Sequence, residues 1–194
     1  MTFEILDISV MRAVYDGHLV SDFPADEVKP FSSIERMYSR GEYFGYGFFD
    51  EQMQLLAYAF FVKGNECEWL LLDYFAVVST ARGRGVGTKA ISLLRDELSF
   101  FDGILIECED PMRVPDGAQR RQRERRIAFY ERLGALLTGV GACVYGVDYS
   151  VLCLPLRART RDGDVYSALR RVYSTMFNSK QLKEKVKTFR KEQY

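Results

Sequence analysis

Apolar and polar residues alternate along this chain with two different periods, and the change from one period to the other marks out the predicted elements. Three runs rich in Phe, Tyr and Leu, at Tyr43–Phe49, Leu55–Val62 and Glu68–Val78, predict strands. The polar segments between them, 50–54 and 63–66, predict turns. We therefore expect these three strands to form an antiparallel meander.

A helical spacing of apolar residues replaces the strand pattern after the meander. The segment 85–100 carries its Val, Ala and Leu residues on one side of a predicted helix. The run Gly103–Cys108 predicts the next strand, so residues 68–108 form a βαβ unit with a right-handed crossover and parallel or nearly parallel strands. The rest of the main fold is predicted as a helix at about 119–133 and strands near 135–140, 141–145 and 147–156.

Helices are also predicted towards both ends of the chain. Residues 8–20 carry a mixed helical spacing, and a second helix follows, with Ser32 and Glu35 as a capping box and Gly41 as its stop. At the other end, the segment 162–190 predicts one or two added helices. We expect the basic last dozen residues to fray.

This order of elements predicts an α/β (α+β) fold with a mixed central sheet and helices on both faces. An antiparallel meander comes first, a βαβ unit follows, and a C-terminal helix is added. A chain of 194 residues is most simply one domain with its own core. We place that domain at residues 1–160 and a helical extension, packed on it or trailing from it, at 161–194.

The formal net charge is zero, so we expect no general affinity for nucleic acid. The charge is nevertheless uneven. Residues 1–60 hold ten acidic and four basic side chains, whereas 119–126 holds five Arg and one Glu, and 180–194 holds six bases and two acids. The acidic first third predicts, as a weak preference, a cationic partner.

Cysteine and histidine usage excludes several kinds of site. The four cysteines are widely spaced and His18 is the single histidine, so we predict no metal site and no Ser-His-Asp or Cys-His triad. The longest apolar run, Leu55–Val62, is too short to span a bilayer, and no signal peptide is apparent. Free thiols in a reducing cytoplasm are the expected setting.

The most informative segment is the turn Arg82-Gly-Arg-Gly-Val-Gly87, which links an apolar strand directly to a helix. Such a turn points backbone N–H groups at one spot, at the positive end of a helix dipole, and predicts a diphosphate site. The Walker A pattern fails because Lys89 follows Thr88 and no Ser or Thr comes after it. The Rossmann pattern fails because its last glycine is replaced by Thr88 and the turn follows an antiparallel meander.

The pattern that fits is [Q/R]-x-x-G-x-[G/A], met by Arg82, Gly85 and Gly87. With it, the sequence resembles the GNAT superfamily of acetyl-CoA-dependent N-acetyltransferases. The segment Phe75-Ala-Val77 is similar to the pantetheine-binding strand end of that family, and Ile127-Ala-Phe-Tyr-Glu-Arg-Leu-Gly134 is similar to its I-x-F-Y-E-K-L-G helix. The resemblance covers about residues 1–156.

The resemblance implies a GNAT-type fold, acetyl-CoA as donor and a set of contacts to it. The implied cofactor contacts are Ala76, Val77 and Val78 at the strand end and Arg82, Gly83, Arg84, Gly85, Val86, Gly87 and Thr88 in the turn. The implied acid is Tyr130, which would protonate the departing thiolate. The general base stays open between Asp73, Glu107 and Glu109. Arg123 stands where the family often has Asn, so that contact is not carried over.

These features predict an N-acetyltransferase that moves an acetyl group from acetyl-CoA to a primary amine by direct attack in a ternary complex. The alternative is a non-catalytic acyl-CoA-binding sensor or interaction module. The expected acceptor is a small molecule or a peptide, with neither membrane nor nucleic acid as partner, and a homodimer is compatible with this scheme. The Arg-rich stretch 120–126 is expected to be a solvated helical face, with an anion-binding role as the alternative.

Overall fold

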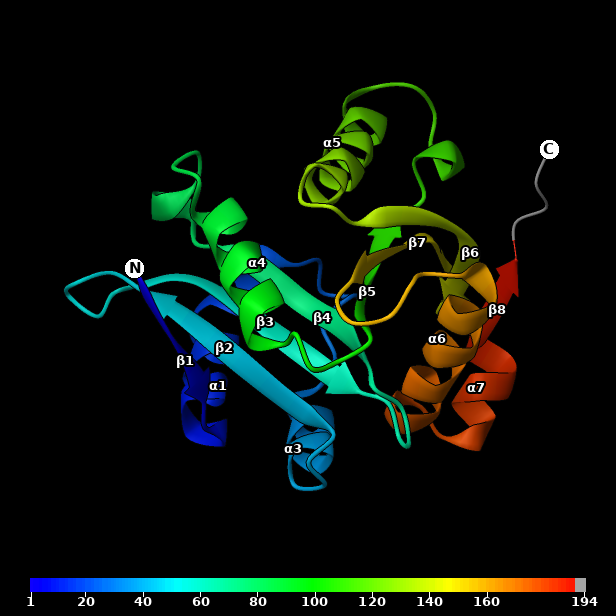
Figure 1. Cartoon of the computed structure of the whole chain (residues 1–194), viewed down its shortest axis with the longest axis horizontal. Helices are drawn as coiled ribbons and strands as arrows, with labels where there is room; N and C mark the ends of the chain where they lie inside the picture. The colour runs from blue at the N-terminus through cyan, green and yellow to red at the C-terminus, as the bar shows by residue number, and fades with distance from the viewer. Residues whose placement is uncertain (191–194) are drawn as a thin grey trace. The chain divides into compact units, whose positions relative to one another are not determined.

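The computed structural model describes residues 1–190, which form eight strands and the helices that pack on them (Figure 1). The chain divides into two compact units. The first comprises residues 1–63 and 72–96, and the second comprises residues 64–71 and the chain from 97 onward. Strand β4 (Trp69–Val77) contributes residues to both units.

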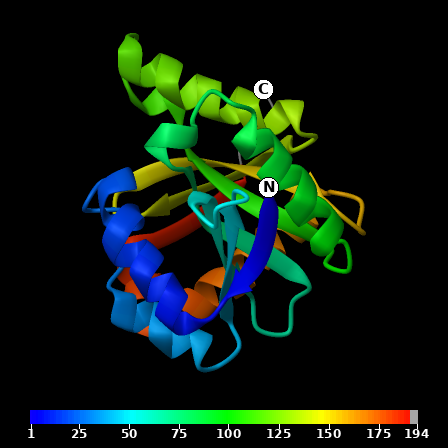
Figure 2. The same ribbon diagram turned by 90° about the vertical axis from the view of Figure 1, so that its left-hand side faces the viewer.

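The first unit contains the N-terminal helices and the meander. Its further elements are β1 (Thr2–Leu6), α1 (Ile8–Val14), the π-helical turn η1 (Tyr15–Leu19), α2 (Val20–Asp22), α3 (Phe31–Tyr38), β2 (Tyr43–Phe49), β3 (Leu55–Lys63), the 3-10 turn η2 (Ser79–Ala81) and α4 (Val86–Glu97). Strands β1, β2 and β3 pair antiparallel, with Thr2 opposite Phe49 and Tyr43 opposite Val62. Figure 2 shows α1 and α3 close together in this unit.

Aromatic rings fill the interior of the meander and explain two glycines of β2. Phe48, Phe60 and Phe61 have no exposed surface. A Cβ at Gly45 would lie 2.6 Å from the Phe60 ring, and one at Gly47 would lie 2.7 Å from the Phe49 ring. Glycine at these positions therefore makes room for rings that larger residues would displace.

The second unit carries the remaining strands. Its elements are β5 (Gly103–Glu109), the 3-10 turn η3 (Pro111–Arg113), α5 (Ala118–Arg132), β6 (Leu136–Val144), β7 (Val147–Pro155), α6 (Asp162–Met176), α7 (Ser179–Lys185) and β8 (Val186–Arg190). The pairs β5–β7, β6–β7 and β6–β8 are antiparallel. Residues 107 and 108 point to opposite faces of β5. Because Glu107 contacts Tyr173 of α6 and Cys108 neighbours Arg126 of α5, these helices cover opposite faces.

The strands hydrogen-bond in the order β1-β2-β3-β4-β5-β7-β6-β8. A sheet with helices on both faces and an added C-terminal helix is the α/β fold class that the sequence predicts. The meander strands, the helix after the turn and the helix before Gly134 all lie within three residues of their predicted bounds.

Several local predictions were wrong. The helix that precedes β2 begins after Pro30 with no side-chain cap, so Ser32 and Glu35 form no capping box. The predicted strands 135–140 and 141–145 are one strand, β6, with an irregular register between Leu137 and Gly141. Residues 186–190, expected to fray, form edge strand β8, while the last four residues of the basic tail lie outside the described chain. No helix among residues 1–190 is long and apolar enough to cross a membrane.

Candidate active site

The Arg/Gly turn lies between β4 and α4, and its residues 82–85 are exposed. Gly83 and Gly85 adopt φ angles of +77° and +74°, in the left-handed region that favours glycine. A Cβ at either position would meet no atom within 4 Å. The backbone conformation therefore favours glycine at both positions, and the space beside them is open to a ligand.

Helix α4 starts at the end of this turn. The N–H of Lys89 donates to the carbonyl of Gly85 at 3.1 Å and opens the hydrogen-bond ladder of the helix. The amides before it, at Val86, Gly87 and Thr88, belong to the first turn, where N–H groups have no intrahelical acceptor and the helix dipole is positive. The geometry of the segment suits an anion with several acceptor oxygens.

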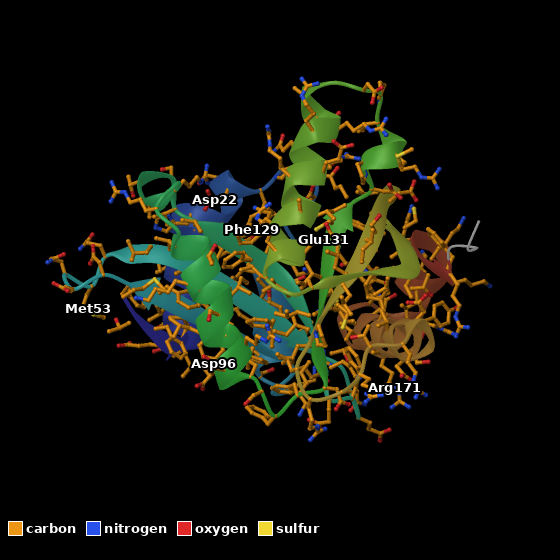
Figure 3. The ribbon with its side chains drawn as sticks, turned by 45° about the horizontal axis from the view of Figure 1, so that its top comes forward. Asp22, Met53, Asp96, Phe129, Glu131 and Arg171 are labelled. Atoms are coloured by element: carbon orange, nitrogen blue, oxygen red, sulfur yellow. The ribbon has the colours of Figure 1, made fainter. Side chains whose placement is uncertain are left out.

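The two arginines of the turn have different environments, although the sequence suggests the same role for both. The Arg82 guanidinium donates to the carbonyl of Val77 at 2.9 Å and to the carboxylate of Asp22 at 2.8 Å. Asp22 is labelled in Figure 3 and also accepts a hydrogen bond of 3.1 Å from Tyr58. Arg82 thus braces the turn against the N-terminal helices. Arg84 is exposed and forms no ion pair within residues 1–190.

A cleft of about 470 Å³ opens beside the turn within the first unit. Arg84, Ser79 and Thr80 line it together with His18 and Asp50. The carboxylate of Asp50 is already engaged, because it accepts hydrogen bonds from the amides of Gln52 and Gln54 in the β2–β3 turn. The cleft therefore presents hydroxyl groups, the imidazole and the Arg84 guanidinium close to the predicted diphosphate site.

The strand end that should hold the pantetheine is partly satisfied by the protein itself. The N–H of Val78 donates to the carbonyl of Leu56 at 3.0 Å, and the carbonyl of Val77 accepts from Arg82. Ala76 and Val77 are half-buried, and Val78 is buried. The Val77 carbonyl and the Val78 N–H are therefore already hydrogen-bonded within the protein. The predicted pantetheine contacts at residues 76–78 are thus limited to the backbone groups that remain.

Asp73 is the centre of a buried polar cluster, not a lone acid. Its carboxylate oxygens lie 2.6 and 2.7 Å from Nζ of Lys29, and the Tyr43 hydroxyl donates to it at 2.6 Å. Nζ of Lys29 also lies 3.5 Å from the Tyr74 hydroxyl and 4.6 Å from the centre of the Tyr74 ring. The Asp73 side chain is 5% exposed and that of Lys29 is 20% exposed.

The cluster raises the pKa values of Lys29 and Tyr43. Burial alone would lower the pKa of the Lys29 ammonium, but Asp73 and Tyr74 outweigh it and the pKa is raised. Burial, aided by the Asp73 charge, raises the pKa of the Tyr43 phenol well above its ordinary value. The carboxylate of Asp73 therefore has the Lys29 ammonium on both oxygens and the Tyr43 phenol on one.

Tyr130, the predicted acid, is buried on α5 in the second unit and is 3% exposed. Burial raises the pKa of its phenol to about 12, although the Arg126 guanidinium one turn earlier opposes the rise. The nearby Cys108 thiol has its own pKa raised to about 12 by burial. Both groups are therefore protonated at neutral pH.

The two carboxylates of β5 have separate partners. The Tyr173 hydroxyl donates to Glu107, and Glu109 forms an ion pair with Arg123. Arg123 also donates to the carbonyl of Asp110 at 2.9 Å, and its side chain is 14% exposed. The expectation of a solvated face is therefore wrong for Arg123, which ties α5 to the end of β5.

Sequence reasoning missed the partners of the predicted residues. Lys29, Tyr43 and Asp22 lie far from Asp73 and Arg82 in the sequence, and no local pattern links them. A lysine before a predicted helix and an aspartate inside an apolar strand are separate signals that only the fold brings together. Within residues 1–190, no group of three His, Cys, Asp or Glu side chains is placed to hold a metal ion.

Comparison with known proteins finds solved structures with a similar fold. No protein-family model matches the sequence, and no curated protein sequence matches it. Among solved structures, a chimera built on the spermidine N-acetyltransferase of Vibrio cholerae is 13% identical, with a TM-score of 0.59 over 80% of this chain and 96% of that chain. The ribosomal-protein-alanine N-acetyltransferase of Escherichia coli is 18% identical, with a TM-score of 0.57 over 83% and 97%.

A protein of Bacteroides thetaiotaomicron assigned to the GNAT family is 20% identical, with a TM-score of 0.62 over 88% of this chain and 94% of that chain. At these identities the likeness shows the fold. It agrees with the motif resemblance at Arg82–Gly87 and Ile127–Gly134. This chain therefore has the fold of the GNAT N-acetyltransferases.

Proposed function

We propose that this protein transfers an acetyl group from acetyl-CoA to a primary amine by direct attack in a ternary complex. The observation that carries the proposal is the Arg82–Thr88 turn, with two left-handed glycines and a helix N-terminus on one open face. The GNAT fold supports the reaction class, because the similar structures are named as N-acetyltransferases.

The turn fits the pyrophosphate of acetyl-CoA. The amides of residues 83–88 would hold its oxygens, and the absence of side chains at Gly83 and Gly85 lets the backbone approach them. Arg84, which forms no ion pair within the described residues, would add a charge-assisted contact, whereas Arg82 is retained by Asp22 and Val77. Ala76, Val77 and Val78 would contact the pantetheine.

The acetyl donor supplies the activated thioester when it is bound. Tyr130 holds a proton at its phenolic oxygen at neutral pH and would deliver it to the leaving sulfur. The Arg126 guanidinium would stabilise the phenolate that remains. For the amine proton, Glu107 and Asp73 stay the proposed acceptors. Because Lys29 and Tyr43 already occupy Asp73, a base acting through water is the other arrangement that we propose.

The first test is binding of the donor. Acetyl-CoA should raise the melting temperature of the protein in proportion to the logarithm of its concentration, whereas ATP and NAD should not. A thiol-release screen over monoamines, polyamines, amino acids and peptides should then find an acceptor. Stabilisation by ATP or NAD without stabilisation by acetyl-CoA would refute the proposal.

The second test separates an enzyme from an acyl-CoA-binding module. Tyr130→Phe should bind acetyl-CoA as the wild type does and lose about 10²–10⁴-fold in kcat, the range expected for one general acid. Tyr145→Phe, which removes a hydroxyl that accepts a hydrogen bond from Gln181 outside the proposed machinery, is the control for the loss of a phenol hydroxyl. Unchanged turnover in Tyr130→Phe would remove this residue from the mechanism, and a wild type that binds acetyl-CoA but acetylates no amine would favour the module.

A further inference from the structure

The cluster around Asp73 has the composition of a binding site for an alkylammonium ion. We propose that Asp73, Tyr43 and Tyr74 form a receptor for the primary ammonium of the acceptor, and that Lys29 occupies it until the acceptor replaces it. This inference rests on the proposed function in one respect, namely that the bound ammonium compound is the acceptor of the acetyl group. The binding event itself involves the first unit alone.

The contacts of Lys29 define the receptor. Its Nζ lies within 2.7 Å of both Asp73 oxygens and 3.5 Å from the Tyr74 hydroxyl, so each of three N–H donors has an oxygen partner. The ring of Tyr74 adds a cation–π contact at 4.6 Å. A carboxylate, a hydroxyl acceptor and an aromatic face are the groups that recognise a primary ammonium. The Tyr43 hydroxyl donates to the same carboxylate and fixes its orientation.

The segment that carries Lys29 is suited to exchange. Residues 24–30 form no regular helix or strand between α2 and α3. The Tyr74 hydroxyl donates to the carbonyl of Glu27 and accepts from the amide of Lys29, both at 2.9 Å. The Tyr15 hydroxyl donates to the carbonyl of Lys29 at 3.0 Å. The backbone at Glu27 and Lys29 is therefore held by the hydroxyls of Tyr15 and Tyr74 and not by hydrogen bonds of the sheet. We infer that this backbone can move while β4 stays in place.

The charge of Asp73 explains why the ligand that replaces Lys29 must be a cation. Removing Lys29 alone would leave Asp73 as an unpaired carboxylate in a site that is 5% exposed. A ligand that brings its own primary ammonium restores the ion pair, whereas a neutral alcohol or a quaternary ammonium lacks either the charge or the N–H donors. The ten acids against four bases of residues 1–60 add a field that attracts cations to this unit.

Amide hydrogen exchange in the wild-type protein is the decisive measurement, because it needs no variant. With saturating propylammonium, hydrogen exchange of the Lys29 amide should rise several-fold, since its acceptor is the Tyr74 hydroxyl. Tetramethylammonium at the same ionic strength should leave it unchanged. An amide exchange rate that ignores propylammonium, or that rises equally with tetramethylammonium, would overturn the proposal.

The variant Lys29→Ala tests the receptor itself. The truncation removes the tethered competitor, so propylammonium should bind at least tenfold more tightly than to the wild type and should restore the melting temperature in a saturable manner. Propanol should do neither, and the double variant Lys29→Ala/Asp73→Asn should lose the effect. Lys183→Ala, an exposed lysine of α7, is the control. Equal propylammonium affinity in wild type and Lys29→Ala would also overturn the proposal.

If Lys29→Ala does not fold, Lys29→Met keeps the side-chain stem and removes only the charge, and the wild-type exchange measurement still decides. All of these measurements are made without acetyl-CoA. An amine effect without acetyl-CoA binding would therefore refute the proposed function alone. Stabilisation by acetyl-CoA without an amine effect would refute this inference alone.

Discussion

Replacing Gly85 with alanine separates the backbone strain of the turn from its capacity to bind a diphosphate. Gly85 has a φ of +74°, and a Cβ built there meets nothing within 4 Å. In the free protein the substitution therefore lowers the free energy of unfolding only by the strain of the left-handed conformation, about 1–2 kcal/mol. For a chain of this length that lowers the melting temperature by about 2–4 °C for each kcal/mol.

The effect on ligand affinity should be larger than this strain predicts. The added methyl group occupies the open space that the proposed pyrophosphate needs, so at least one backbone N–H contact to it is lost. A hydrogen bond to a charged group contributes about 1.5–3 kcal/mol. At about 1.4 kcal/mol for each factor of ten, acetyl-CoA should bind roughly 10–100-fold more weakly to Gly85→Ala.

A matched glycine provides the control. Gly41 follows α3 with a φ of +70°, and a Cβ at this position would also meet nothing within 4 Å, so Gly41→Ala carries the same strain away from the turn. Urea denaturation should give the two variants similar losses of unfolding free energy, and calorimetric titration should show weaker acetyl-CoA binding in Gly85→Ala alone. Wild-type affinity in Gly85→Ala would refute the assignment of this turn to the diphosphate.

Three further predictions concern the second unit. The Phe189 ring lies over Gly141, where a Cβ would be 2.5 Å from it. Because Phe189 is only half-buried, Phe189→Ala should cost about 1–2 kcal/mol, less than the loss of a fully buried Phe, and should speed amide exchange in β8. Unchanged exchange would contradict this packing. Burial raises the pKa of Cys108 to about 12 and of Cys153 to about 11, so maleimide at pH 8 should label them only after unfolding. Because unfolded thiols ionise near pH 9, these two groups should lower stability as the pH rises above 9, and a flat urea midpoint between pH 9 and pH 11 would contradict their burial.

The sequence predicts the meander well for a physical reason. Continuous apolar runs with both faces buried end sharply at polar turns, so β2 has its predicted bounds, Tyr43–Phe49. The same reasoning fails at β6, where the sequence predicts two strands, at 135–140 and 141–145, instead of one. Gly141 instead accommodates the ring of Phe189 from β8, a contact across the sheet that the local pattern does not contain.

The candidate site shows the same limit. The turn is found from the sequence because its glycines, arginines and helix start lie within seven residues, and each has a local conformational reason. Asp73 is recognised as unusual, but its partner Lys29 lies 44 residues away, and nothing in the pattern of either segment specifies the pairing. Five-residue β1 is missed because it is short and mostly exposed.

The proposed donor turn and the proposed ammonium receptor both belong to the first unit, and they use different residues of it. The turn acts through backbone amides and depends on Gly83 and Gly85. The proposed receptor acts through the Asp73 carboxylate and the Tyr43 and Tyr74 hydroxyls, and Lys29 competes for it. Gly85→Ala should therefore weaken acetyl-CoA binding and leave the propylammonium response intact, whereas Lys29→Ala should strengthen propylammonium binding and leave acetyl-CoA binding intact. If either variant impaired both ligands equally, the cause would be a general loss of structure in this unit, and the assignment of separate donor and amine sites would fail.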